Sequence, residues 1–167
     1  MTIKIGDTIP AGTLAESIEF GDACPLGPEN IDVTQACSGK KIAIFAVPGA
    51  YTPTCSAQHV PGYLENLDAL KAKGVDEVWC VATNDGFVMA AWGKETGGIG
   101  KIRFLGDGSA KWAHALGLEL DLVERGMGVR MQRFSMLVDD GVVTQLNIEA
   151  SGKFEVSNAE TLLAQLS

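Results

Sequence analysis

Cys55 stands where an apolar segment changes into a turn and then into a helical pattern. Residues 41–47 are mostly β-branched or aromatic, which is typical of a strand buried on both faces. Pro48-Gly49 ends that strand, and Pro53 disfavours helical dihedral angles at Thr52. We therefore expect Cys55 in the first turn of a helix, where unpaired backbone N–H groups and the helix dipole favour a thiolate.

The alternative for Cys55 is a small buried hydrophobe, which is the usual role of a free cysteine. The other three cysteines, Cys24, Cys37 and Cys80, are widely spaced in a chain too large to need disulfides, so we expect reduced thiols. Cys80 lies within an apolar run and is first of all a core residue. With only two histidines, His59 and His114, the sequence predicts no metal site.

The elements that position Cys55 alternate between strands and helices. Tyr63, Leu67 and Leu70 recur at helical spacing before Gly74, which predicts one long helix that starts near Cys55. Strands are predicted at residues 75–83 and 101–105. Between and after them we expect a helix capped by Asn84 or Asp85 that ends near Gly97, and a short helix at residues 109–116 capped by Ser109.

The two ends of the chain add further strands. Residues 133–139 and 142–148 flank Asp140-Gly141, a strong hairpin signal, and residues 158–166 read as a closing helix. Residues 13–20 read as a strand, residues 21–40 mainly as loop with room for one short strand, and residues 118–132 as irregular. The sequence therefore predicts an α/β fold, a mixed central sheet flanked by helices, in a single domain over residues 1–167.

Composition excludes several classes of partner. Apolar residues make up 46% and charged residues 20% of the chain, which are ordinary globular values. The net charge of −8, with no run of basic residues, argues against nucleic acid and anionic membranes as partners. Because no signal peptide and no apolar stretch of membrane-spanning length are visible, we expect a cytoplasmic, reducing location.

The run Pro48-x-x-x-Thr52-x-x-Cys55 resembles the active-site motif of the peroxiredoxins, thiol peroxidases with a thioredoxin-like fold. The fuller form, residues 47–56, is similar to the type II branch, also called type V. Similar runs occur at His59-x-Pro61-Gly62, Asn84-Asp85-x-Phe87-Val88 and Ala91-Trp92-Gly93, so the resemblance extends from about residue 5 to the C-terminus. It implies a thioredoxin-like core with N-terminal strand additions.

By this resemblance Cys55 is the peroxidatic nucleophile, whose thiolate attacks one peroxide oxygen while the other leaves as alkoxide or hydroxide. The Thr52 hydroxyl can hydrogen-bond the thiolate or the peroxide, and Pro48, which has no N–H, can shield the sulfur from water. The backbone N–H groups of Thr54 and Cys55 can act as donors to an anion. No metal, flavin or haem cofactor is implied, because the sulfur itself changes oxidation state.

The reaction also needs a fixed cation, and Arg130 and Arg133 are the candidates near a strand end. Arg133 immediately precedes the predicted strand 134–139, although it could equally be a solvated charge at a strand end. The peroxiredoxin resemblance favours Arg133, since Arg133-Phe134-Ser135-Met136 is similar to the element that carries the family's arginine. His59, four residues after Cys55, either orders the pocket or packs in the core.

Recycling is where the chain departs from some type II members, which carry a resolving cysteine in the stretch that corresponds to residues 152–158. Here that stretch has none. Cys80 matches a cysteine of plant-like members, but a mid-strand position would require movement before it could bond Cys55. We therefore expect a one-cysteine mechanism, in which glutathione, glutaredoxin or thioredoxin reduces the Cys55 sulfenic acid, with Cys80 as the less favoured resolving residue.

The sequence thus predicts a thiol peroxidase for hydrogen peroxide and small organic hydroperoxides, and by resemblance a homodimer. The rival is a non-peroxidatic thioredoxin-like protein, either a thiol exchanger or a binding module. An exchanger would ordinarily carry two cysteines separated by two residues, whereas Pro53-Thr54-Cys55-Ser56 offers one. Neither Cys24 nor Cys37 is expected to be needed for turnover.

Overall fold

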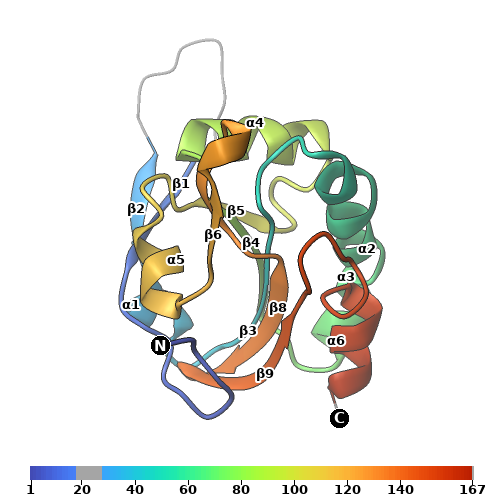
Figure 1. Ribbon diagram of the computed structural model, residues 1–167. Coiled ribbons are helices and arrows are strands. Elements are labelled where there is room, and N and C mark those ends of the chain that lie inside the picture. The colour runs from blue at the N-terminus through green and yellow to red at the C-terminus, as the bar shows by residue number, and fades with distance from the viewer. Residues whose placement is uncertain (18–27, 167) are drawn as a thin grey trace.

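Within the described residues, 1–17 and 28–166, seven strands form one mixed sheet in the order β2-β1-β5-β4-β3-β8-β9 (Figure 1). The structure is a computed structural model, and for Cys55 it describes the backbone alone. The three central strands run parallel, and the outer ones pair antiparallel. Their bounds are β1 Thr13–Glu16, β2 Glu29–Asp32, β3 Lys41–Ala46, β4 Glu77–Ala82, β5 Arg103–Gly106, β8 Phe134–Asp139 and β9 Val142–Ile148.

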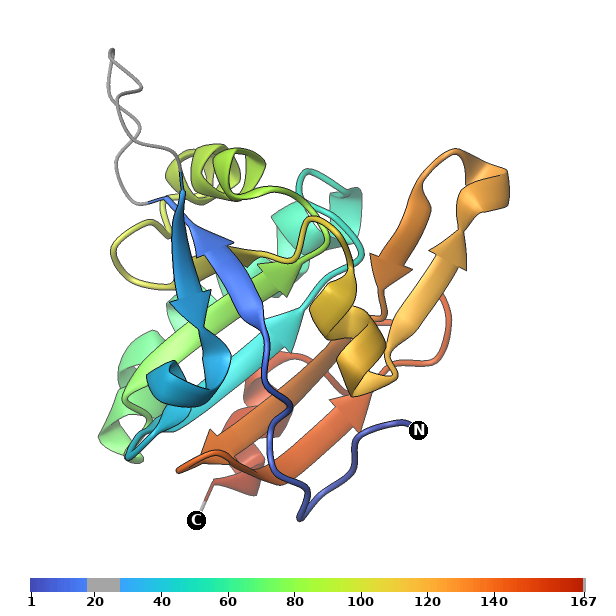
Figure 2. The same ribbon diagram turned by 90° about the vertical axis from the view of Figure 1, so that its left-hand side faces the viewer.

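Helices cover both faces of this sheet (Figures 1 and 2). One face packs against α1 (Val33–Cys37) and α5 (Lys111–Leu116). The other packs against α2 (Val60–Glu65), α3 (Leu67–Ala72), α4 (Gly86–Glu95) and α6 (Ala159–Gln165). The predicted fold class, a thioredoxin-like mixed sheet between helices with added N-terminal strands, is confirmed.

The central strand β3 separates the two layers of core. Ile42 and Ile44 point into one layer, while Ala43 and Phe45 point into the other, and all four are fully buried. This alternation is what a strand covered on both faces requires, so the apolar run read from the sequence has its predicted role. The chain leaves β3 at the carboxyl end of the parallel strands, where the turn that precedes Cys55 begins.

The C-terminal elements also match the sequence. Asp140 and Gly141 have φ angles of 47° and 82° and connect β8 to β9 in the left-handed conformation that a tight hairpin turn needs. Asn158 caps α6, since its side chain accepts a hydrogen bond from the backbone N–H of Thr161 at 2.8 Å.

The helix predicted to run unbroken from Cys55 is interrupted. A π-helical turn, η1 (Cys55–His59), comes first, and Asn66 then separates α2 from α3. Pro61 explains the first irregularity, because it has no backbone N–H to donate to the preceding turn and its ring disfavours regular α-helical hydrogen bonding there.

Three other segments differ from expectation. Residues 118–132 are not irregular: they form a second, two-stranded sheet from β6 (Glu119–Leu122) and β7 (Gly128–Met131), joined through η2 (Val123–Arg125). The short strand allowed for in residues 21–40 is β2, but the helix α1 that follows it was missed. The first strand, predicted over residues 13–20, ends at Glu16, and its residues 18–20, like Cys24, lie outside the described part of the chain.

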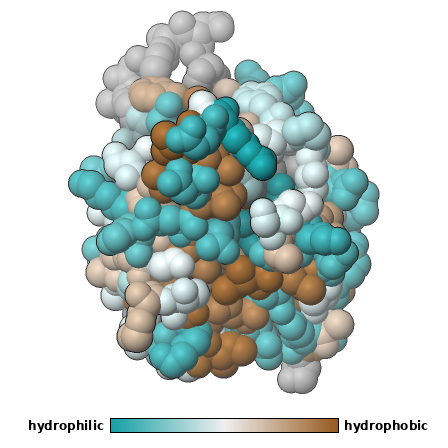
Figure 3. Space-filling model, viewed as in Figure 1, coloured by the Kyte–Doolittle hydropathy of each residue, from teal (hydrophilic) through white to brown (hydrophobic). Residues whose placement is uncertain are grey.

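The β6–β7 hairpin projects from the body of the molecule (Figure 2). Its residues Val123 and Val129 are among the exposed large hydrophobic side chains, and the upper part of the face in Figure 3 carries hydrophobic surface over this hairpin. Among the helices that the structure describes, none has the length and apolar character needed to cross a membrane.

Capping of α5 also differs from the sequence prediction. The buried Asp107 side chain, rather than Ser109, accepts from the backbone N–H groups of Trp112 and Ala113, at 3.1 and 2.8 Å. Ala110 begins the helix with a φ of 55°, which turns the chain so that Asp107 faces the first turn.

We expect Asp107→Ala to lower the free energy of unfolding by about 1–2 kcal/mol, because two buried N–H groups lose their acceptor. Ser109→Ala is the matched control and should change it by less than about 0.5 kcal/mol. Urea denaturation of both variants measures the difference. Equal losses would contradict the assignment of the cap.

Candidate active site

The loop between β3 and η1 is fixed by hydrogen bonds at several points. The N–H of Val47 donates to the carbonyl of Val81 on β4 at 3.0 Å. The N–H of Ala50 donates to the Asn84 side chain at 2.9 Å. Asn84 therefore holds the loop, and it is Asp85 that caps α4 by accepting from the N–H of Val88. This resolves the alternative left open for the α4 cap.

Thr52 and Cys55 lie at the start of the helical segment. The Thr52 hydroxyl donates to the carbonyl of Gly49 at 2.9 Å, and the Thr52 carbonyl accepts from the N–H of Ser56 at 3.0 Å. Tyr51, with a φ of 67°, adopts the left-handed conformation that a non-glycine residue rarely takes. This strained residue lies in a loop that is held by the hydrogen bonds of Val47 and Ala50 before it and by that of Ser56 after it.

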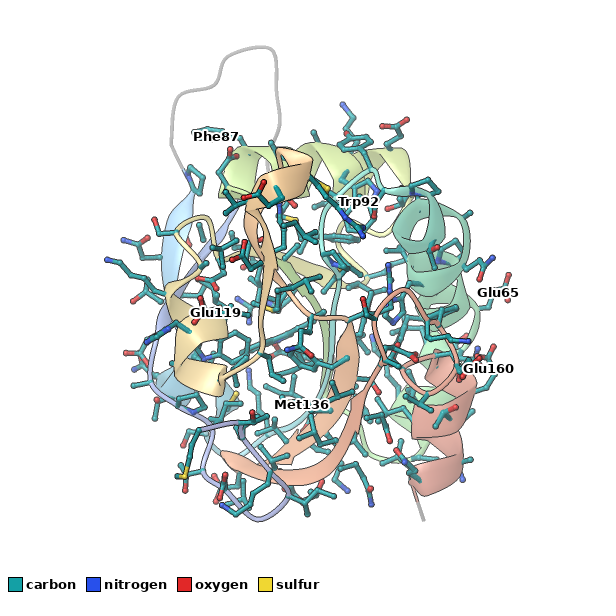
Figure 4. All side chains as sticks on the ribbon, viewed as in Figure 1. Glu65, Phe87, Trp92, Glu119, Met136 and Glu160 are labelled. Carbon is teal, nitrogen blue, oxygen red and sulfur yellow. The ribbon has the colours of Figure 1, made fainter. Side chains whose placement is uncertain are left out.

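Trp92 of α4 braces the same turn from the other side. Its indole N–H donates to the Ser56 hydroxyl at 3.0 Å, and its ring lies 6.4 Å from that of Tyr51. Figure 4 labels Trp92 between α4 and the segment that leads into α2. The residue after Cys55 is therefore tied to a buried tryptophan.

The two candidate arginines have separate positions. Arg130, on β7, donates to the carbonyls of Met127 at 2.7 Å and Pro48 at 3.3 Å, so it supports the loop from the hairpin side. Arg133 directly precedes β8, whose first residue Phe134 pairs with Ala46 at the end of β3. This register brings the start of β8 beside the loop that begins after β3.

The Arg133 side chain contacts two aromatic rings, those of His59 and Phe154. Its Nη1 lies 2.8 Å from His59 Nδ1, and its guanidinium carbon lies 5.8 Å from the centre of the Phe154 ring. The His59 and Phe154 rings are 4.7 Å apart. The reading of Arg133 as a solvated charge is therefore wrong: it is half-buried and engaged at the head of β8.

His59 is fully buried, and its other ring nitrogen, Nε2, lies 3.0 Å from the carbonyl of Ser157. Tyr63 donates to the same carbonyl at 3.0 Å. Burial, reinforced by the positive charge of Arg133, lowers the pKa of His59 to about 3, so the ring is neutral at physiological pH. His59 therefore packs in the core, as one of the two sequence alternatives expected, and it also contacts Arg133; that it orders the pocket stays a prediction.

Glu149 is a buried acid next to Arg133, because its backbone N–H donates to the Arg133 carbonyl at 3.0 Å. Its carboxylate accepts from the N–H groups of Glu155, Val156 and Ser157 and from the Ser157 hydroxyl, at 2.7–3.0 Å. Burial opposes ionisation, but these hydrogen bonds outweigh it and hold the pKa of Glu149 below its ordinary value. Sequence reasoning missed Glu149, although an acid directly after a strand and before a glycine-containing loop was an available signal.

An open pocket joins these parts. Pro48 and Thr54 come from the loop around Cys55, and Arg133 comes from the start of β8. The remaining lining comes from the hairpin and the loop after β9, namely Leu120, Gln132, Glu149, Ala150, Ser151, Gly152 and Lys153. The structure thus brings together Pro48, Thr54 and Arg133, with the backbone of Cys55 directly beyond Thr54.

The remaining sequence candidates lie in the core or away from the pocket. Cys80 is fully buried in β4 opposite Phe45, as expected of a core residue. Cys37 is fully buried too, and burial together with the charge of Glu77 raises the pKa of its thiol to about 11. His114 is exposed on α5 and contacts Glu119. Across the described ranges, no group of three or more histidine, cysteine or acidic side chains is arranged to hold a metal ion.

Comparisons with known proteins agree with this geometry. The model of the Redoxin family matches residues 4–163. Peroxiredoxin-2B of Arabidopsis thaliana is 46% identical over 98% of both chains. The crystal structure of reduced Prx3 from Vibrio vulnificus in complex with H2O2 is 48% identical, with a TM-score of 0.90 over 99% of this chain and 100% of that one. A 1-Cys peroxiredoxin of Plasmodium falciparum is 26% identical, with a TM-score of 0.86 over 98% of both chains.

The lowered pKa of Glu149 predicts a pH dependence of stability. A depressed carboxyl pKa contributes stability above the unfolded-state pKa, and this contribution is lost as pH falls through the folded-state pKa. We expect the wild type to lose more stability than Glu149→Gln does as pH falls below about 5 and then through the lower folded-state pKa of Glu149. Ser157→Ala, which removes one donor, should fall between the two. Parallel acid-stability curves for wild type and Glu149→Gln, measured by urea denaturation at each pH, would contradict this.

Proposed function

The chain belongs to the Redoxin family and, within it, to the peroxiredoxins, which are thiol-dependent peroxidases, and from this premise we propose that Cys55 is the residue that attacks the peroxide. Its thiolate forms a bond to one peroxide oxygen as the O–O bond breaks. The other oxygen leaves with the bonding pair and takes up a proton, giving water or an alcohol. Cys55 becomes a sulfenic acid.

The observation that carries this proposal is the shared pocket of Pro48, Thr54 and Arg133. In it, Pro48 offers no N–H and limits water near the sulfur. Arg133 supplies a permanent positive charge for the thiolate and for the leaving oxygen. The N–H groups of Thr54 and Cys55, at the start of a helical segment, favour the same negative charge. Thr52, whose hydroxyl donates to Gly49, offers its oxygen as acceptor for the peroxide O–H.

Two hydrogen-bonding systems support these groups. Arg130 and Asn84 hold the loop that carries Pro48 and Thr52, and His59 contacts Arg133. Substrates of this site are hydrogen peroxide and small organic hydroperoxides. The pocket is also lined by the exposed residues Ser151 and Lys153, and an alkyl group of the substrate would lie against this part of the lining.

A one-cysteine cycle is the favoured route of recycling. Cys80 is fully buried in the middle of β4, so a bond to Cys55 would require part of the core to open. An external thiol, from glutathione, glutaredoxin or thioredoxin, attacks the sulfenic sulfur and releases water, and a second thiol then restores Cys55. The similarity to a protein described as a 1-Cys peroxiredoxin supports this choice. Cys24 and Cys37 take no part in it.

The assembly and location follow the same reasoning. A homodimer is supported by the exposed Val123 and Val129 on the hairpin whose residue Leu120 lines the pocket. A reducing compartment such as the cytoplasm supplies the thiols that the cycle consumes. Residues 1–167 act as one domain, since the family model spans nearly the whole chain.

The rival function, a thiol exchanger or a binding module, would not explain why Pro48, Thr52 and Arg133 lie around Cys55.

Replacing Cys55 with serine should abolish peroxidase turnover. One equivalent of hydrogen peroxide should add one oxygen to the wild type at Cys55 alone, which intact mass and peptide mapping detect. Cys80→Ser should keep both the added oxygen and the turnover with an external thiol. A Cys55–Cys80 disulfide would overturn the one-cysteine cycle, and retained turnover in Cys55→Ser would overturn the assignment of the nucleophile.

Arg133→Met should slow the reaction of the protein with peroxide by about a hundredfold or more, because both the charge and its donors are lost. Arg133→Lys keeps the charge without the planar fork and should lie between that variant and the wild type. Stopped-flow tryptophan fluorescence measures the peroxide step directly. A rate for Arg133→Met equal to that of the wild type would remove Arg133 from the mechanism.

A further inference from the structure

We propose that Glu149, acting through Ser157 and His59, positions the guanidinium of Arg133, so that the loop over residues 149–157 is a positioning element of the peroxidase site. The chain of contacts is continuous, from the Glu149 carboxylate to the Ser157 N–H and hydroxyl, from the Ser157 carbonyl to His59 Nε2, and from His59 Nδ1 to Arg133 Nη1. The inference rests on the proposed role of Arg133 in the reaction.

The donors and acceptors of this chain allow one arrangement of protons. A carbonyl oxygen can only accept, so His59 Nε2 must carry the hydrogen that it shares with Ser157. A guanidinium can only donate, so His59 Nδ1 must be the unprotonated acceptor for Arg133. The loop carbonyl therefore selects the tautomer of His59 that can hold the arginine.

A neutral acceptor suits an arginine that acts on a thiolate. Aspartate or glutamate in the place of His59 would hold the guanidinium equally well but would cancel much of its charge. A buried, neutral imidazole fixes the direction of Arg133 and leaves its positive charge to the sulfur and the leaving oxygen. Phe154 contributes in the same way, since its ring flanks both His59 and Arg133 without carrying charge.

The negative charge of this region is on the Glu149 carboxylate, which reaches the Arg133 guanidinium through Ser157 and His59 and accepts several hydrogen bonds. Glu149 accepts from three backbone N–H groups and one hydroxyl, which holds residues 155–157 in a bend and directs the Ser157 carbonyl at His59 of η1 and Tyr63 of α2. A buried carboxylate is costly unless it is hydrogen-bonded in this manner. Its place directly after β9 ties the loop to the strand that pairs with β8.

A pair of amide variants separates the two bonds of His59. In His59→Asn the side-chain oxygen takes the place of Nδ1 and can still accept from Arg133. In His59→Gln the amide reaches toward the Nε2 position and can still donate to Ser157. Tyr63→Phe is the control, since it removes a bond to the same carbonyl without touching Arg133. The readout is the second-order rate of the Cys55 reaction with hydrogen peroxide, with unfolding curves confirming that each variant is folded.

We expect His59→Gln to slow the peroxide step by about tenfold to a hundredfold, as a small misplacement of a catalytic group does, with His59→Asn recovering most of that loss. Tyr63→Phe should stay within about threefold of the wild type. In an Arg133→Met background the two His59 variants should have equal rates, because the group that they position is gone. His59→Asn as slow as His59→Gln, or a full His59→Gln effect without Arg133, would overturn the inference.

A measurement on the unmodified protein covers the case in which the His59 variants do not fold. Nitrogen chemical shifts of 15N-labelled histidine at neutral pH should show His59 with Nε2 protonated and Nδ1 unprotonated, and Glu149→Gln should broaden or shift those signals. The Nδ1–H tautomer, or an imidazolium, would sink the inference. A wild-type rate with peroxide no greater than that of free cysteine would instead overturn the peroxidase role of Arg133 itself.

Discussion

The register between β3 and β8 places Arg133 relative to the loop that carries Cys55, because it sets Phe134 opposite Ala46 and so brings the residue before β8 beside the turn after β3. Side chains alternate between the faces of a strand, so a slip of one residue would turn Arg133 away and would bury its neighbours on the wrong face. Both strands are held in this register by side chains that enter two separate cores. The position of Arg133 at the site therefore depends on the apolar packing of β3 and β8.

Around this framework, three polar side chains of the site are each hydrogen-bonded to a backbone group. Asn84 meets the N–H of Ala50, Arg130 meets the carbonyl of Pro48, and His59 meets the carbonyl of Ser157. Backbone groups of ordered segments have little freedom, so they orient their partners at a small further loss of entropy. The sheet and the short loops together therefore fix the side chains that line the pocket of Pro48, Thr54 and Arg133.

Much of this could be predicted from the sequence, where local chemistry determines local structure. The apolar run of β3, the Asp140-Gly141 turn and the Asn158 cap each act within a few residues. The misses involve partners distant in sequence. Asp107 rather than Ser109 caps α5, and β6 and β7 are short and half-exposed. Arg133 was favoured over Arg130 by its place before a predicted strand and by the family resemblance, but its contacts with His59 and Phe154 join segments that are distant in the sequence. The contacts of Glu149 could not be predicted, because most of its donors are backbone N–H groups, which do not depend on residue type.

The binding of Glu149 to backbone N–H groups affects how such a site can change during evolution. Glu149 binds the N–H groups of Glu155, Val156 and Ser157, and every residue except proline offers the same group. The side chains of Glu155 and Val156 point outward and are exposed. Mutations at these two positions are therefore nearly neutral for the geometry around Arg133. A lineage can gain or lose a cysteine there, and with it a different route of reduction, while the peroxide chemistry stays under constant selection.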